Sequence, residues 1–307
     1  MFKDDINAGQ GSNYVIPLNP PLVKGENVLR TPRPEWLKVK APVGETYSNL
    51  KSMIRSKSLH TVCEEARCPN MGECWSAGTA TFMILGDICI RNCRFCAVSS
   101  GKPLPPDPKE PINVAEAVKS MAVRHAVITS VNRDELPDQG SEHWAKTILE
   151  VRKINPKVSI EVLIPDFMGD MECLKRVVDS KPDILNHNIE TVPRLYAAIR
   201  PKAIYQRSLT VLNESKKMGM RTKSGLMVGI GEKTEEVFEV MKDLKAHNVD
   251  IVTIGQYLQP TPKHAIVDRF VHPDEFAEYK RIGLEMGFKH VESGPLVRSS
   301  YHAELHA

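Results

Sequence analysis

The chain has 307 residues, 41% hydrophobic and 26% charged, which is the composition of a globular protein with one large domain or two modest ones. Its formal net charge of +3 is too small to predict binding to nucleic acid. No apolar run reaches the roughly 18 residues of a membrane span, so we expect no membrane insertion. The N-terminal residues include early acidic side chains and no apolar core, which argues against a secretory signal or a transit peptide and favours a cytoplasmic location.

The first 78 residues divide into stretches of different character. Residues 1–45 are rich in Pro, Gly and Asn and show no periodicity, which predicts an extended N-terminal arm. Residues 45–60 predict a short helix. This helix leads into CEEARCPNMGEC at 63–74, the first of two cysteine groups.

From residue 79 the sequence alternates between short apolar runs and amphipathic segments. Strands are predicted, from runs rich in β-branched residues, at 81–85, 125–131, 158–165, 183–190, 225–230 and 250–258. Helices are predicted between them, at 113–123, 141–154, 170–180, 204–219 and 234–248. Six βα units in succession predict an α/β fold with a parallel sheet, which could close fully, close partly or stay open. In barrel-like versions the active site lies at the C-terminal ends of the strands.

Cys89, Cys93 and Cys96 follow the first predicted strand in the sequence CIRNCRFC. Three thiolates on one short loop can bind three irons of a [4Fe–4S] cluster and leave the fourth iron without a protein ligand. Thiolates also select zinc and copper(I), so a structural zinc site is the alternative. A structural zinc site is a closed tetrahedron, and no other Cys and no His lies between residues 75 and 124 to complete it.

Cys63, Cys68 and Cys74 form the other group, with the spacing C-x4-C-x5-C. It too lacks a fourth ligand, so a second cluster or a zinc knuckle with a distant histidine would fit. Two such groups so close in sequence favour two clusters that serve one cavity. The sequence leaves three sources for the missing ligand, which are Cys173, His60 and the C-terminal segment. A cysteine in an amphipathic helix, like Cys173, is usually a small core residue.

The spacing C-x3-C-x2-C after the first strand of a (βα)6 pattern, with Phe95 before the last cysteine, resembles the radical S-adenosylmethionine (SAM) enzymes. The resemblance implies a partial (β/α)6 barrel of the TIM type with N-terminal and C-terminal extensions. It also implies that the open iron binds SAM and that reduction of the cluster yields a 5′-deoxyadenosyl radical. Phe95 would then lie near the adenine.

The longer pattern resembles one family of these enzymes, the lipoyl synthases. The resemblance covers residues from about 30 to 303 and rests on both cysteine groups, on VNRDELPDQG and NHNIE, and on the terminal RSSYHA. It implies that two sulfur atoms are inserted at carbons 6 and 8 of a protein-bound octanoyl chain, with the auxiliary cluster of Cys63, Cys68 and Cys74 as the sulfur donor. It further implies that Ser300 is the fourth ligand of this cluster, with Ser299 as the less favoured register.

On this basis we expect four segments. They are an extended arm at 1–45, an auxiliary-cluster segment at 46–78, a radical SAM partial barrel at 79–290 and a segment at 291–307 that closes over the auxiliary cluster.

Polar residues after the second predicted strand are candidates for binding SAM or lining the auxiliary cluster. These are Asn132, Arg133 and Asp134, although a solvated turn would use the same residues. The glycines of GLMVGIGE at 225–232 do not have the G-x-G-x-x-G spacing, so we reject a dinucleotide site there.

The fourth predicted strand ends in further polar residues. If the strand is regular, Asn188 and Glu190 lie on one face of it. Glu190 could accept hydrogen bonds from the SAM ribose. Arg200 could pair with the SAM carboxylate, or it could be a surface arginine.

The resemblance also implies partners. The substrate would be an octanoylated lipoyl carrier protein or domain, either the glycine cleavage H protein or the E2 acyltransferase of a 2-oxoacid dehydrogenase. A ferredoxin or flavodoxin would supply electrons, and an iron–sulfur cluster donor would rebuild the auxiliary cluster. The alternatives are another radical SAM enzyme with two clusters, of the methylthiolating or biotin-forming type, and a non-catalytic iron–sulfur carrier or zinc scaffold.

Overall fold

The computed structural model describes residues 32–38, 52, 54, 59–61, 64, 68, 70–71, 81–121 and 123–300. Most of the predicted N-terminal arm lies outside these residues, and the described part of it contains one short 3₁₀ helix, η1 (Glu35–Leu37). Of the helix predicted at 45–60, the described residues Ser52 and Ile54 are helical, whereas Leu59 is not and His60 begins a strand, so the predicted C-terminal end of this helix is wrong. Also outside the description are Cys63, Cys74 and residues 301–307.

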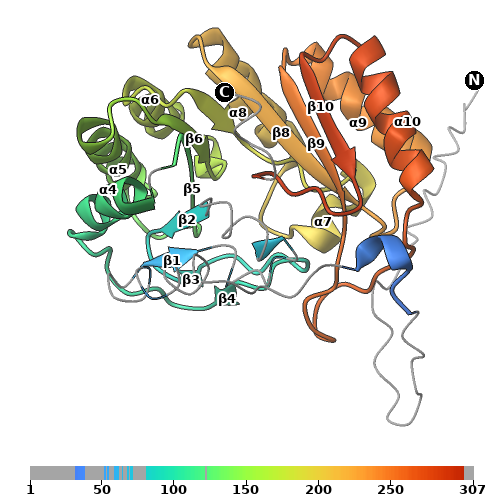
Figure 1. Ribbon diagram of the computed structural model, residues 1–307, viewed down its shortest axis with the longest axis horizontal. Helices are drawn as coiled ribbons and strands as arrows, with labels where there is room; N and C mark the ends of the chain where they lie inside the picture. The colour runs from blue at the N-terminus through green and yellow to red at the C-terminus, as the bar shows by residue number, and fades with distance from the viewer. Residues whose placement is uncertain are drawn as a thin grey trace, which may run out of the picture. The chain divides into compact units, whose positions relative to one another are not determined.

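A sheet of eight strands forms the framework of the described fold, in the order β1-β2-β5-β6-β7-β8-β9-β10 (Figure 1). Its strands are β1 (His60–Thr61), β2 (Thr81–Ile84), β5 (His125–Ser130), β6 (Ser159–Leu163), β7 (Ile184–Asn186), β8 (Arg221–Val228), β9 (Ile251–Gln256) and β10 (His290–Gly294). Only β1 is antiparallel to its neighbour, and all the other pairs are parallel. A separate two-stranded sheet joins β3 (Ile88–Cys89) to β4 (Ser99–Ser100).

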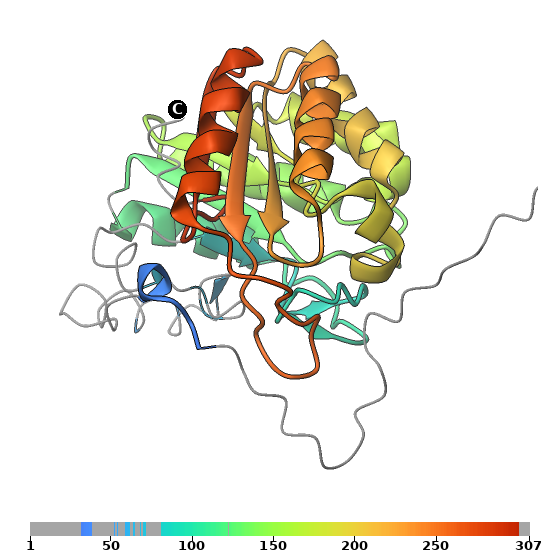
Figure 2. The same ribbon diagram turned by 90° about the vertical axis from the view of Figure 1, so that its right-hand side faces the viewer.

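Helices connect the parallel strands, as right-handed crossovers require. They are α4 (Glu110–Met121), α5 (Ser141–Ile154), α6 (Met171–Asp179), α7 (Tyr196–Ile199), α8 (Tyr205–Lys217), α9 (Thr234–Ala246) and α10 (Pro273–Glu285), with the short 3₁₀ helices η2 (Phe167–Gly169) and η3 (Pro193–Leu195). Both views show α9 and α10 beside β9 and β10 (Figures 1 and 2). Within the described residues, no helix has the length and apolar character needed to cross a bilayer.

Alternate residues of each strand pack against these helices and form the core. On β6, Ile160 and Val162 belong to one hydrophobic cluster, and on β9, Val252 and Ile254 belong to a second. The residues between them in each strand point to the other side of the sheet, which we call the inner face. The strand pattern that predicts the sheet therefore also fixes which residues can reach the inner face.

The inner face carries a buried ion pair. Lys223 Nζ on β8 donates to both carboxylate oxygens of Glu161 on β6, at 2.9 and 3.1 Å, and both side chains are fully buried. Asn186 Nδ2 on β7 donates to the same carboxylate at 3.2 Å. Burial alone would raise the pKa of Glu161, but Lys223 and His125 together lower it to about 2. The inner face is therefore polar and charged where the helix-facing side is apolar.

The sequence prediction of an α/β fold with a mostly parallel sheet is confirmed, and the sheet is open rather than closed into a barrel. All six predicted strands are present. The structure adds a seventh parallel strand, β10, preceded by α10, so the sheet continues past residue 290. The strand predicted at 183–190 is shorter than expected, because regular pairing ends at Asn186 and Glu190 has a φ of +70°.

Candidate functional site

The cluster loop, residues 89–96, follows β2 and carries Cys89, Cys93 and Cys96 as free, half-buried thiols. Asn132, which follows β5, is hydrogen-bonded to the start of this loop. Its carbonyl accepts from the Ile90 N–H at 3.2 Å. Its backbone N–H and its side-chain amide both donate to Cys89 Sγ, at 3.3 and 3.8 Å. Hydrogen bonds to ligand sulfurs are one of the means by which proteins set the reduction potential of an iron–sulfur cluster.

The C-terminal end of the cluster loop is hydrogen-bonded to residues near 199 and near 265. The Arg94 N–H donates to Ile199 O at 2.8 Å, and the Ala265 N–H donates to Arg94 O at 2.9 Å. His264 Nε2 donates to Cys96 O at 2.9 Å. Segments near residues 132, 199 and 265 therefore meet at one loop.

Arg91 links the cluster loop by hydrogen bonds to the segments that follow β5 and β6. Its guanidinium donates to both carboxylate oxygens of Asp134, at 2.7 and 2.9 Å, and to Asp166 at 2.5 Å. Arg207 donates to the other oxygen of Asp166 at 3.2 Å. Arg91 and Asp166 are buried, so these charge-assisted bonds lie where they are stronger than at a surface. Arg91 and Asp166 were not among the candidates from the sequence.

This network predicts a dependence of stability on acid pH. Burial would raise the pKa of Asp166, but its bonds to Arg91 lower the pKa to about 2, whereas an unfolded aspartate titrates near 3.9. The network should therefore contribute about 2 kcal/mol of stability above pH ~4, lost as the pH falls toward ~2. In urea unfolding of the cluster-free protein, we expect Asp166→Asn to be less stable near neutral pH and to lose less stability between pH 4 and 2. If the free energies of unfolding of the two proteins fell by the same amount between pH 4 and 2, this assignment would be wrong.

Arg133 and Phe95 have contacts within the chain. Arg133 donates to Glu135 at 2.5 Å, to Leu85 O at 3.1 Å and to Leu104 O at 3.0 Å, so it fixes the loops after β2 and β5. Phe95 is half-buried against the second hydrophobic cluster. Cofactor contacts of both residues stay predictions.

After β7, Asn188, Glu190 and Arg200 come together. Asn188 Nδ2 donates to Glu190 Oε1 at 3.1 Å and to Ser299 Oγ at 3.2 Å. Arg200 Nη1 donates to the carbonyls of Asn188 and Ile189, at 2.9 and 3.1 Å. Arg200 is buried, so the alternative of a surface arginine is wrong. Burial raises the pKa of Glu190, and Arg200 opposes this shift.

Several buried polar atoms around the cluster loop fit a polar ligand. Within the described part of the chain, Asn132 Oδ1, Asn188 Oδ1 and Arg200 Nε have no hydrogen-bond partner. Such atoms are costly unless a ligand or water satisfies them. Together they offer two acceptors and a cationic donor, and the carboxylate of Glu190 lies beside them. This set matches SAM, which carries an ammonium, a carboxylate and ribose hydroxyls.

The thiols are protonated and unreactive in the absence of a metal. Burial raises the pKa of Cys93, and it raises the pKa of Cys96 to about 12. Burial likewise raises the pKa of Cys68, while the charge of Arg298 opposes the shift. A thiol that holds its proton so firmly is unreactive until a metal displaces the proton.

The C-terminal segment, residues 295–300, lies against the auxiliary cysteine segment. Asn70 Nδ2 donates to Leu296 O at 2.7 Å. Arg298 lies close enough to Cys68 for its charge to lower the pKa of that thiol. Cys68 also packs against the first hydrophobic cluster, as Cys89 does. Cys68 and the C-terminal segment that carries Ser299 and Ser300 are therefore neighbours.

Gly255 on β9 allows the C-terminal segment to approach the sheet. A Cβ atom at this position would overlap the backbone carbonyl of Val297 and would lie 3.2 Å from Arg298 Nη1. Gly294 is its register partner on β10, and a Cβ there would lie 3.3 Å from a methyl group of Val297. A Cβ atom at position 255 would thus collide with rigid backbone, whereas one at position 294 would contact only the end of a side chain.

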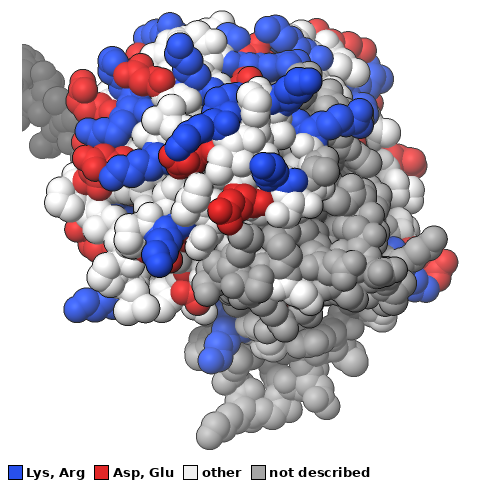
Figure 3. All heavy atoms as spheres, turned by 60° about the vertical axis from the view of Figure 1, so that its left-hand side comes forward, with Lys and Arg blue, Asp and Glu red and all other residues white. Residues whose placement is uncertain are grey.

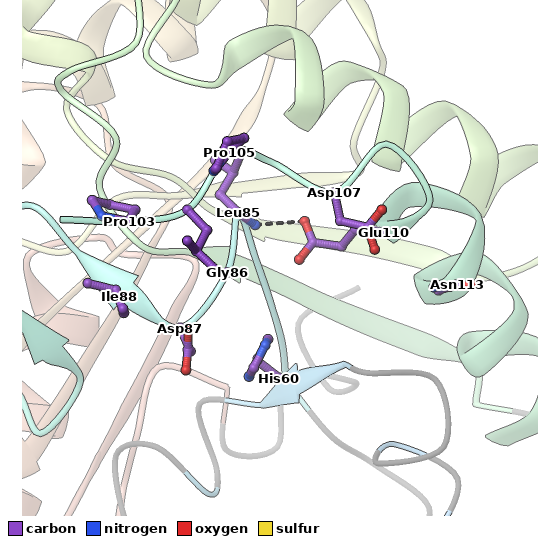
Figure 4. A pocket seen from close by; sticks show the side chains of 11 residues that line it. His60, Leu85, Gly86, Asp87, Ile88, Pro103, Pro105, Asp107, Glu110 and Asn113 are labelled. Atoms are coloured by element: carbon purple, nitrogen blue, oxygen red, sulfur yellow. Dashed lines mark hydrogen bonds between the residues drawn. The ribbon is translucent and has the colours of Figure 1, made fainter. Parts of the chain in front are cut away.

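The other proposed sources of the missing ligand have different surroundings. Cys173 is buried in α6 within the first hydrophobic cluster, and its Sγ donates to Asp138 O at 3.2 Å, so its interpretation as a core residue is confirmed. His60 on β1 lines a cavity of about 210 Å³ together with Asp87 and Glu110 (Figure 4). Glu110 in this cavity accepts from the Leu85 N–H at 2.7 Å.

Two family models match the chain. One is the radical SAM superfamily, over residues 83–244, and the other is the N-terminal domain of lipoyl synthase of the radical SAM family, over residues 16–68. The fold also resembles a crystal structure of methylornithine synthase (PylB), with a TM-score of 0.52 at 12% identity over 82% of this chain and 83% of that one. At this identity the likeness shows the fold alone.

Curated relatives match over most of their length. Lipoyl synthase from Rubrobacter xylanophilus is 60% identical over 88% of this chain and 85% of its own. Lipoyl synthase from Chlorobaculum parvum is 56% identical over 89% of this chain and 94% of its own. Taken with the family models and the radical SAM fold, these matches show that the chain belongs to the lipoyl synthase family of radical SAM enzymes.

Proposed function

We infer that the chain is a sulfurtransferase that inserts two sulfur atoms at carbons 6 and 8 of an octanoyl chain on a lipoyl carrier, using SAM and two [4Fe–4S] clusters. When bound, one cluster cleaves SAM reductively to give the radical that removes hydrogen, and the auxiliary cluster supplies the sulfur. The observation that carries the residue assignment is the side-chain amide of Asn188. It donates both to Glu190, on the SAM side, and to Ser299, on the auxiliary side.

We assign Cys89, Cys93 and Cys96 to the cluster that binds SAM. To the auxiliary cluster we assign Cys63, Cys68, Cys74 and Ser300. Ser299 already accepts a hydrogen bond from Asn188, which supports Ser300 as the ligand and Ser299 as the residue that orients it. An oxygen ligand is harder and weaker than a thiolate toward iron, which suits a cluster that must give up its sulfide.

The remaining candidates would hold SAM. Arg200 would bind the SAM carboxylate through Nε, since its Nη1 is used within the chain. Glu190, which is half-buried beside Asn188 and Arg200, would accept from the ribose hydroxyls. Asn132 would offer its unpaired Oδ1 to a donor of SAM, while Asp134 acts through Arg91 by fixing the cluster loop.

The proposed partners follow from the reaction. The substrate chain would be carried by the glycine cleavage H protein or by the E2 acyltransferase of a 2-oxoacid dehydrogenase. A ferredoxin or flavodoxin would reduce the cluster, and an iron–sulfur donor would restore the auxiliary cluster after each turnover. We place the reaction in the cytoplasm.

Anaerobic reconstitution tests this function. Mössbauer spectra of the loaded protein should show two [4Fe–4S] clusters, and SAM, dithionite and an octanoyl-lysyl peptide should give 5′-deoxyadenosine and a dithiolated peptide. A single cluster, or bound zinc, would refute the assignment. Intact clusters that cleave SAM without forming dithiolated peptide would instead favour another radical SAM enzyme with two clusters.

The fourth ligand has a separate test. We expect Ser300→Ala to lower the iron bound at the auxiliary site by more than half while the cluster at 89–96 stays intact, because the auxiliary cluster then lacks one of its four ligands. Ser299→Ala should keep both clusters. Mössbauer spectra resolve the two sites, and loss of the auxiliary cluster in Ser299→Ala instead would shift the ligand by one residue.

A further inference from the structure

Three segments around the cluster loop carry basic residues and no acidic ones. They are 88–106, 196–207 and 257–267. Their basic residues are Arg91, Arg94, Lys102, Arg200, Lys202, Arg207 and Lys263. We propose that the outer side of this loop is the docking surface for a negatively charged one-electron carrier protein, which deepens the proposed function by stating where its reductant binds.

The three segments are joined in the fold, although they are far apart in sequence. Backbone hydrogen bonds connect Arg94 to Ile199 and to Ala265. Lys202 Nζ donates to Ile90 O at 3.1 Å. Both ribbon views place β3, β4 and the loop between β9 and α10 at the same edge of the described fold (Figures 1 and 2).

The basic residues divide into two groups by their exposure to solvent. Arg91 and Arg207 bind buried carboxylates, and Arg200 is buried beside Glu190. The other four are exposed, and we call them the basic rim. The basic rim consists of Arg94, Lys102, Lys202 and Lys263.

The position of the basic rim suits electron entry. Asn92 and Arg94 are exposed between the half-buried cysteines of the cluster loop. The inner side of the loop faces Asn132 and Arg200, which we assign to SAM. A carrier on the basic rim therefore reaches the loop from outside and leaves the SAM side open. One electron leaves the carrier and enters the cluster site, and no atom is transferred.

The basic rim differs in charge from the face covered by α4, α5 and α6, which we call the helix-covered face. On that face basic and acidic side chains are interspersed (Figure 3), and pairs such as Lys146–Glu142 and Lys175–Asp179 neutralise one another. The nearest acidic residues in sequence to the basic segments are Asp87, Asp107 and Asp268, and the first two line the cavity of Figure 4. A local positive patch steers an acidic partner and raises its association rate. Electron-transfer complexes use small interfaces, so four charges are a sufficient footprint.

The experiment compares two double charge reversals in the loaded enzyme. Lys102→Glu with Lys263→Glu changes the basic rim without touching the cluster loop. Lys146→Glu with Lys175→Glu makes the same change of net charge on the helix-covered face. Binding of an oxidised flavodoxin and of an oxidised ferredoxin is measured at several salt concentrations. SAM cleavage is measured with each reduced carrier and with dithionite.

We expect the rim variant to bind the preferred carrier about tenfold more weakly at low salt and to lose most of the salt dependence of binding. Its SAM cleavage with that carrier should fall, while cleavage with dithionite stays at the wild-type rate. The control variant should match the wild type. The proposal is overturned if neither carrier binds the wild type, if the rim variant binds as the wild type does, or if both variants lose binding equally. Failure of dithionite to drive SAM cleavage in the wild type would instead refute the proposed function, and the binding arm would still test the surface.

Discussion

Replacing Gly255 with alanine should remove the auxiliary cluster while leaving the cluster at 89–96 in place. The added methyl group overlaps the backbone carbonyl of Val297, which cannot rotate away as a side chain can. The C-terminal segment must then lift from β9 and take Ser299 and Ser300 with it. We expect about half of the iron to be lost after reconstitution, with SAM cleavage retained and formation of dithiolated product abolished.

Gly294→Ala is the matched control, because Gly294 is paired with Gly255 in the sheet. Its new methyl group meets only a methyl of Val297, at 3.3 Å, and a shift of a few tenths of an ångström relieves the contact. Iron content and Mössbauer spectra should therefore match the wild type. Hydrogen exchange of residues 295–300 in the cluster-free proteins should rise in Gly255→Ala alone. Equal iron loss in both variants would show that the C-terminal segment does not depend on Gly255.

Arg91→Met should destabilise the cluster-free protein by about 3–5 kcal/mol, because it removes the cationic partner of Asp134 and the closer of the two cationic partners of the buried Asp166. The side chain of Asp166 is fully buried, and after the substitution it keeps the longer ion pair with Arg207, at 3.2 Å. The free energy of unfolding in urea, measured at neutral pH, gives the effect directly.

Arg194→Met provides the comparison at a surface. Arg194 makes a bidentate pair with Glu236, with both distances 2.8 Å, but its side chain is 40% exposed. Loss of an exposed pair should cost no more than about 1 kcal/mol. If Arg91→Met costs as little as Arg194→Met, then Arg91 does not anchor the cluster loop.

Much of the fold follows from local patterns in the sequence. Strands such as β5 and β9 were predicted because they contain short runs rich in β-branched residues, which burial on both faces of a parallel sheet selects. β10 escaped prediction because its sequence HVESG alternates polar residues and lies at the edge of the sheet. The end of β7 was placed too late, since the left-handed conformation of Glu190 has no signal in a single sequence.

The site was predictable where spacing carries the chemistry. Motifs predict the roles of the cysteines and the serines, which stay predictions, and the structure does bring Asn188, Glu190 and Arg200 together. Residues that support the site through distant contacts were missed. Asp166 and Gly255 are examples, because each acts on a segment more than 40 residues away. A glycine within a strand run was the one available signal, since such a glycine often marks a close approach of another backbone.

Both cysteine groups are contacted by parts of the chain that are synthesised late. The cluster loop is fastened by residues near 199 and 265, and the auxiliary segment by residues 296–300. Because a ribosome releases the N-terminal part first, neither cysteine group can make these contacts on a short nascent chain. A chain whose translation stops between residues 270 and 295 would keep the contacts of the cluster loop and lack the C-terminal serines. If Ser300 is the ligand that we propose, such a product would have its radical source without its sulfur source, and full-length translation would be a condition for pairing the two.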